Sequence, residues 1–238
     1  MKITMRPMSV EEAWDFILRN HSNYHKYLKR FGYSYDMFIP KNDSFRQMFD
    51  KETLTQQDIE QYKNVFITRI YEERKLRHLD NIFETQVKPN FEQIVNKYLA
   101  PLVPLWNATM PKEFQILCGF GNGAGYWRKS DDLAVVLFRM SRFPDDATKV
   151  MDVLFHEFVH MLIEEPIIEK YNVPQDLKER IVDLICYEAL KTPVQKMFEK
   201  SFANAYITPE VIKTDLPGAV AKMMTDYTAL KQKQGKEY

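Results

Sequence analysis

The run His156-Glu157-Phe158-Val159-His160 places two histidines four residues apart, with a glutamate beside the first. On an α-helix, residues four apart lie on one face, so both imidazoles can reach a single cation. Nearly every other side of this helix is apolar, because it also carries Val150, Val153, Leu154, Phe155, Leu162 and Ile163. A helix that is apolar all round is buried, and buried polar side chains need partners. The run therefore predicts a central helix whose polar residues bind a metal ion.

A third metal ligand has to come from another part of the chain. A catalytic zinc ion takes three protein ligands and keeps one position open for water. No histidine follows His160, and Ile163 and Pro166 stand where the glycine and third histidine of the longer three-histidine motif would lie. The third ligand is then a carboxylate, or else it lies upstream.

A second acidic motif lies in a helix predicted from Pro174 to about Leu190. Within it, Glu179 and Asp183 are one turn apart and share a face with Cys186. This acidic pair is therefore expected to point in the same direction as buried residues.

Together, the two motifs resemble the gluzincin group of zinc metallopeptidases over about residues 144–190. In that family, the glutamate of the second helix binds zinc, and the acid one turn later hydrogen-bonds a zinc-binding histidine. The resemblance implies that one Zn²⁺ is bound by His156, His160 and Glu179. It also implies that Asp183 orients His156, a role whose loss typically costs roughly 10- to 100-fold in affinity or activity.

The resemblance further implies the hydrolysis of a peptide bond. Zinc lowers the pKa of water towards neutrality, and Glu157 acts as general base and passes the proton to the leaving amine. The family stabilises the oxyanion with a histidine or tyrosine, for which Tyr187 and Tyr206 are the candidates here. Glu164 and Glu188 remain alternative third ligands, although Glu164 follows the two histidines closely on the same helix.

Two short apolar runs before the motif helix predict strands, at Glu113 to Cys118 and at Leu133 to Met140. The glycine-rich segment between them is followed by a strand, whereas a phosphate-binding loop leads into a helix, so nucleotide binding is not expected. Tyr126 and Trp127 are predicted to bind the substrate, because an extended peptide can add to a strand beside the cleft. Ordinary hairpin packing is the alternative.

The composition is that of an ordinary enzyme. The 238 residues carry no net charge and no long basic run, so nothing indicates nucleic acid as a partner. No apolar stretch approaches the length of a membrane span, and the first residues lack a signal-peptide core. Cys118 and Cys186 are interpreted as two buried thiols, and the compartment stays open.

The first hundred residues are predicted to be helical. Ser9 and Glu12 form a capping box that begins a helix through Leu18. A long amphipathic pattern runs from residue 57 to Lys88-Pro89, and a further helix covers 91–99. We expect an N-terminal helical part over 1–105 and a catalytic part over 106–238, which can also form one continuous domain. His21 and His25 are also four apart, but no acid lies between them, so they are predicted to be surface residues.

Near the end of the chain, Thr208-Pro209-Glu210 begins a helix that Leu216-Pro217-Gly218 is expected to break, before a last helix over about 219–231. The sequence thus predicts a mainly helical α+β protein with a zincin-like fold and a small sheet beside the active-site helix. Its expected function is zinc-dependent hydrolysis of peptide or protein substrates. The alternatives are a zinc site that acts on another amide or has lost catalysis, and a metal-free helical interaction protein.

Overall fold

The fold is described from a computed structural model that covers residues 1–26, 29, 42–71, 81–119, 126–129, 133–139, 147–191 and 201–234. The strands at 126–129 and 133–139 are described by their backbone alone. The strands are β1 (Lys2–Pro7), β2 (Glu113–Gly119), β3 (Tyr126–Lys129) and β4 (Leu133–Arg139). The helices of the N-terminal half are α1 (Val10–Lys26), α2 (Asp43–Asp50), α3 (Gln56–Arg69), η3 (Phe83–Val87), α5 (Lys88–Ile94) and η4 (Val95–Leu99). Those of the C-terminal half are α6 (Ala147–Ile163), η6 (Glu164–Glu169), α7 (Gln175–Leu190), η7 (Phe202–Ala205), α8 (Pro209–Thr214) and α9 (Leu216–Gln234).

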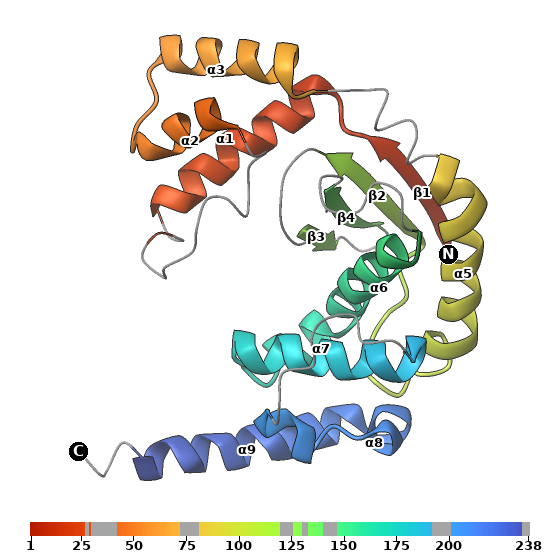
Figure 1. Cartoon of the computed structure of the whole chain (residues 1–238). Coiled ribbons are helices and arrows are strands. Elements are labelled where there is room, and N and C mark those ends of the chain that lie inside the picture. Colours follow the sequence, from red (N-terminus) through yellow and green to blue (C-terminus); the bar gives the residue numbers. More distant parts are fainter. Residues whose placement is uncertain are drawn as a thin grey trace.

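The elements form an open arc (Figure 1). Helices α1, α2 and α3 lie at one end, the sheet and α6 lie in the middle, and α7, α8 and α9 follow towards the other end. Most of the described residues are helical and one small sheet is present, so the predicted class, α+β and mainly helical, is confirmed.

The sheet has four strands in the order β1-β2-β4-β3. β1 and β4 pair in parallel with β2, and β3 pairs antiparallel with β4. The strands predicted at 113–118 and 133–140 are confirmed within a residue. β1 was not predicted, because apolar and polar side chains alternate over too few residues there to distinguish a strand from the start of a helix. Its pairing with β2 buries Ile3 and fixes the strand.

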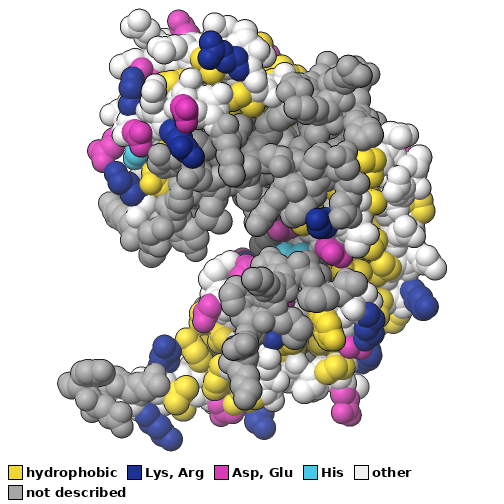
Figure 2. Space-filling view, viewed as in Figure 1, with side chains coloured by type: hydrophobic (Ala, Val, Ile, Leu, Met, Phe, Trp, Pro, Cys, Tyr) yellow, Lys and Arg dark blue, Asp and Glu magenta, His cyan; other side chains and the backbone are white. Residues whose placement is uncertain are grey.

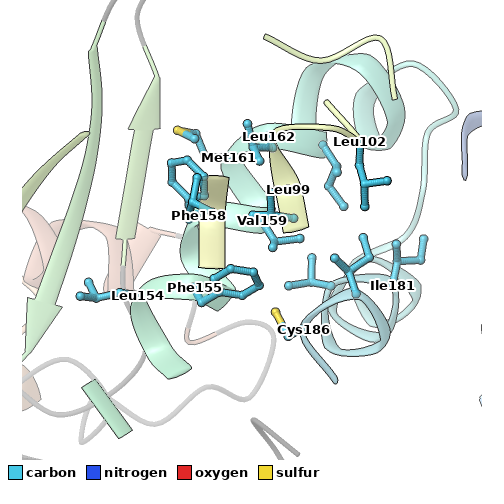
Figure 3. Close-up of a cluster of buried hydrophobic side chains, with 14 of the residues drawn as sticks. Leu99, Leu102, Leu154, Phe155, Phe158, Val159, Met161, Leu162, Ile181 and Cys186 are labelled. Atoms are coloured by element: carbon cyan, nitrogen blue, oxygen red, sulfur yellow. The ribbon is translucent and has the colours of Figure 1, made fainter. Parts of the chain in front are cut away.

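α6 lies between the sheet and α7, and its apolar side chains form the centre of the core (Figure 3). Phe158 packs edge-on against Phe114 of β2, with ring centroids 4.8 Å apart, and against Phe91 of α5 at 5.5 Å. On the side of α7, Val159 and Ile181 are fully buried. Since packed interiors tolerate little movement, these contacts fix the rotation of α6 and therefore the direction in which its histidines point.

Two clusters of buried side chains lie in the described part of the chain. The larger one joins β1, the helical run 81–99 and α6 to α9. The smaller one is formed mainly by α1, α2 and α3. The larger core thus draws residues from both sides of the predicted boundary at 105. Whether the two predicted parts fold separately stays a prediction.

The predicted continuous helix from 57 to Lys88-Pro89 is wrong in its bounds. α3 ends at Arg69, and residues 72–80 lie outside the described part of the chain. The helical structure described from residue 81 onwards continues past Pro89 to Leu99. A wide π-turn precedes the proline, with Lys88 N–H bonded to Phe83 O. This turn shifts the hydrogen-bond register, so the missing N–H of Pro89 and its bulky ring are accommodated at the start of α5.

The prediction that His21 and His25 lie on the surface is wrong for His21, which is buried, and His25 is partly buried. His21 Nε2 lies 2.7 Å from Lys51 O, and His25 Nε2 lies 2.8 Å from Phe49 O. These carbonyls belong to the end of α2, where backbone acceptors lack partners within the helix. The pair therefore closes the C-terminus of α2, and burial lowers the pKa of His21.

The remaining helix predictions are partly confirmed. Ser9 and Glu12 form the predicted capping box through reciprocal bonds of 2.9 and 3.1 Å, but α1 extends to Lys26. α8 begins as predicted at Pro209. The expected break at 216–218 is instead the first turn of α9, where Asp215 Oδ1 accepts the Gly218 N–H at 2.9 Å. Proline is tolerated there because first-turn N–H groups lack helical acceptors.

Candidate metal centre

The two histidines of α6 are held deep in the protein. His156, Glu157 and His160 are all buried although they are polar. The rings of the two histidines lie one above the other, with centroids 4.6 Å apart and planes crossing at 77°. In Figure 2, histidine side chains are visible at the centre of the molecule, next to acidic side chains.

α7 returns alongside α6 and brings Glu179 to the histidines. The connection runs through η6 and a turn in which Asn172 adopts a left-handed backbone conformation with φ 52°. Asparagine tolerates this conformation better than most residues. Pro174 then stands at the N-cap of α7, in an extended conformation. The turn chemistry of residues 170–174 therefore sets where the first two turns of α7 meet α6.

Three potential ligand atoms meet between the two helices. His156 Nε2 and His160 Nε2 are 3.0 Å apart, and Glu179 Oε2 lies 3.4 and 3.3 Å from them. They form the one group of three histidine, cysteine or acidic side chains that could hold a metal ion within the described residues. The helical spacing of His156 and His160 and the antiparallel return of α7 together produce this triangle.

The triangle has the dimensions of a tetrahedral zinc site. Bonds of about 2.0–2.2 Å from zinc to nitrogen or oxygen place two tetrahedral ligand atoms about 3.3–3.6 Å apart. The observed separations of 3.0, 3.4 and 3.3 Å lie close to that range. Because the donors are two imidazoles and one carboxylate, the chemistry of the set also fits zinc. The Glu179 side chain is 41% exposed while those of the histidines are 6% and 4% exposed, so the triangle opens towards solvent on the side of Glu179.

Asp183 lies behind His156. Its Oδ1 is 3.4 Å from His156 Nδ1, the ring nitrogen that faces away from the triangle. Burial lowers the pKa of His156, but hydrogen bonds with Asp183, Cys186 and Glu179 outweigh it and raise this pKa to about 12. Burial also raises the pKa of Glu179, yet hydrogen bonds to both histidines bring it well below its ordinary value. The acidic surroundings thus favour a positive charge at His156, supplied by a proton or by a metal ion that displaces it.

Glu157 is not part of the triangle. Its side chain is buried, and burial raises its pKa above the ordinary value of a glutamate, against the lowering effect of the two histidines. A buried carboxylate beside a cation site can accept a proton there and release it again. The role of Glu157 as the general base stays a prediction.

The two alternative third ligands are engaged elsewhere. Glu164 pairs with Lys178, with Oε2 and Nζ 3.0 Å apart. Glu188 pairs with Lys191 at 2.7 Å and with Lys213 at 2.5 Å. Among the carboxylates that the sequence offered, Glu179 is the one that the structure brings to both histidines.

Sequence reasoning missed Gln175, which holds the other oxygen of Glu179. Gln175 Nε2 donates to Glu179 Oε1 at 2.6 Å, while Oε2 faces the histidines. Gln175 stands one helical turn before Glu179, so the i, i+4 spacing was the signal that could have found it. The bond restricts the rotation of the carboxylate.

The remaining predicted site residues are not joined to the triangle. Tyr187 lies two turns beyond Glu179, about 12 Å along the helix axis, and Tyr206 donates its hydroxyl to Asp226 at 2.8 Å. Within the described residues, no hydrogen bond links either hydroxyl to the histidines or to Glu179, so their role as oxyanion donors stays a prediction. Tyr126 and Trp127 begin β3, and their side chains lie outside the part that the structure describes.

The chain matches no protein-family model, and neither a curated protein nor a solved structure shows significant similarity to it. Across the described residues, every helix is too short or too polar to cross a membrane. Any functional conclusion therefore rests on the residues of the site itself. Cys118 and Cys186 are buried and form no disulfide within the described residues, as predicted.

Proposed function

We propose that this chain is a zinc metallopeptidase of gluzincin type with a zincin-like fold. The observation that carries the proposal is the triangle of His156 Nε2, His160 Nε2 and Glu179 Oε2, with separations of 3.0 to 3.4 Å. Three electron-pair donors converge on one point in a largely buried site. Such an arrangement is unfavourable unless a cation occupies that point.

The residues around the triangle fit roles in amide hydrolysis. Zinc, when bound, supplies a Lewis acid that polarises a carbonyl and lowers the pKa of water. Glu157 takes the proton of the attacking water and gives it to the leaving amine. Asp183 Oδ1, 3.4 Å from His156 Nδ1, is placed to accept the Nδ1 proton, which would keep the lone pair of Nε2 directed into the triangle. A purely structural zinc site closes with a fourth protein ligand and has no use for a buried base, which favours an enzyme.

The sheet supports a site for an extended substrate. β3 is an edge strand that pairs with β4 on one side, within the described residues. An edge strand offers backbone groups to which a peptide can add. We assign substrate binding to β3, with Tyr126 and Trp127 at its start.

Metal content tests the proposal most directly. Elemental analysis of protein purified without added metal or chelator should find about one zinc per chain, as the donor set predicts. His156→Ala should lose most of it, because two ligands bind zinc far more weakly than three. His25→Ala is the matched control and should keep its zinc, since His25 contacts the end of α2. Absence of zinc from the wild type, even after reconstitution, would favour the metal-free interaction protein.

Gln175→Ala should weaken zinc binding by roughly 10-fold, at the low end of the 10- to 100-fold range for partners of metal ligands. The carboxylate of Glu179 would lose the donor to Oε1 and rotate more freely. Competition with a chelating dye measures the affinity. Gln57→Ala, at an exposed glutamine of α3, is the control. Equal affinities for wild type and Gln175→Ala would show that Gln175 does not position the ligand.

A further inference from the structure

Arg180 is a buried cation that the proposed mechanism does not use. It follows Glu179 on α7, and only 4% of it is exposed. Its Nε donates to Asn204 Oδ1 at 2.7 Å, but its Nη1 is buried without a hydrogen-bond partner. None of the ion pairs formed by the described residues includes this guanidinium. A buried arginine normally has a carboxylate partner, because burying an unpaired charge is costly.

The acidic residues of α7 do not pair with Arg180, including Asp176, which lies exposed one turn before it. Glu188 binds Lys191 and Lys213, and Glu179 accepts from Gln175 and faces the two histidines. Asp183 lies beside His156. The charge of Arg180 is therefore left available for an anion from outside the described chain.

An apolar pocket lies next to Arg180. Residues 180, 184, 187 and 188 share one side of α7, since they follow helical spacing. Leu184, Tyr187 and Glu188, whose carboxylate is paired with two lysines, line a cavity of about 230 Å³. Ile207 and Ile212 line its opposite wall. Asn204, the residue that binds Arg180, lines the same cavity. Drug-sized ligands occupy about 300–1,000 Å³, so this space suits a single amino-acid side chain.

We propose that Arg180 binds a carboxylate of the substrate, with an apolar side chain of the same ligand in the adjacent pocket. The planar guanidinium presents paired N–H donors that match a carboxylate. This proposal rests on the proposed peptidase function and names its substrate class, peptides with a carboxylate near the cleaved bond. The carboxylate comes from the C-terminus of the peptide or from an acidic side chain.

The position of Arg180 on α7 limits how far that carboxylate lies from the cleaved bond. Consecutive Cα atoms are about 3.8 Å apart, and neighbouring helical side chains point about 100° apart, so Glu179 reaches the histidines while Arg180 reaches Asn204 on another side of α7. An extended peptide advances about 3.3–3.6 Å per residue. A carboxylate held at Arg180 therefore belongs to a residue within a few positions of a bond held at the triangle.

Small probes test the proposal without turnover. The midpoint of thermal unfolding is measured against increasing N-acetyl-leucine and N-acetyl-leucinamide, which differ in the carboxylate alone. A ligand that binds the folded state raises this midpoint. We expect the acid to bind at least about tenfold more tightly than the amide, as a charge-assisted contact predicts. N-acetyl-aspartic acid α-amide distinguishes a side-chain carboxylate from a C-terminal one. Equal shifts with all three probes would overturn the proposal.

The same titration in His156→Ala separates this proposal from the metal site. Arg180 needs no zinc, so the preference for the acid should persist in that variant. A preference that disappears with the metal would mean that the carboxylate binds zinc, which contradicts the role of Arg180. The metal analysis of wild type is independent of this result, so each proposal can fail alone.

Arg180→Gln should lose the preference for the acid while its zinc content stays at the wild-type level. Its own unfolding midpoint should be equal or higher without ligand, because the substitution removes an unpaired buried charge. Lys222→Gln on α9 removes a cation that does not line the pocket and should retain the preference. A retained preference in Arg180→Gln would refute the assignment. If that variant fails to fold, the wild-type comparison of acid with amide still decides.

Discussion

Glu157→Gln should keep about one zinc per chain and lose roughly 100-fold or more of the peptide hydrolysis rate, which is the effect of removing a general base. The substitution preserves the size of the side chain and removes its ability to accept a proton. Glu157 is not one of the three converging donors, so metal binding should not depend on it. Elemental analysis and initial rates on a peptide library measure the two effects.

The matched control is Glu169→Gln, which removes a carboxylate from the exposed end of η6. It should leave both zinc content and rate unchanged. A Glu157→Gln variant that turns over like wild type would remove Glu157 as the base. Hydrolysis that survives complete removal of zinc by chelator would contradict the metallopeptidase itself.

The candidate site could be predicted from the sequence more fully than the fold, because its residues are brought together by structure that is local in the sequence. His156 and His160 depend only on helical spacing within α6, which an apolar seventeen-residue helix guarantees. Glu179 required one further step, since a short turn between two helices returns the chain antiparallel. Its competitors Glu164 and Glu188 could not be excluded from sequence, because their lysine partners are set by tertiary contacts.

The errors arose where distant residues decide the local structure. β1 is a strand because β2 pairs with it across more than a hundred residues. His21 is buried because the end of α2 needs a donor, a contact that spans thirty residues. The sequence pattern predicted Arg180 only as one residue of a helix. Its burial, with Nη1 lacking a hydrogen-bond partner, is visible in the structure alone. Each case depends on long-range packing, which overrides local propensity.

Glu179→Ala should reduce zinc binding far more than Glu188→Ala, although both remove one carboxylate from α7. Glu179 Oε2 completes the triangle with the two histidines, whereas Glu188 is held by Lys191 and Lys213. A two-histidine site lacks the third ligand that zinc enzymes use, so the Glu179 variant should purify with little zinc and no activity.

The midpoint of thermal unfolding is a second measurement for the two variants. Glu188→Ala leaves two lysines without their buried partner and should lower the unfolding midpoint while keeping its zinc. Metal-free Glu179→Ala should unfold at a lower midpoint than metal-free wild type, because, against the effect of burial, hydrogen bonds to the histidines hold the pKa of this carboxylate below its ordinary value. Zinc content is therefore what separates the two variants. The opposite pattern, with zinc lost in Glu188→Ala and kept in Glu179→Ala, would move the third ligand to Glu188. Because the histidines lie 3.0 Å apart and only Glu179 approaches both within the described residues, that pattern would require α7 to shift along α6.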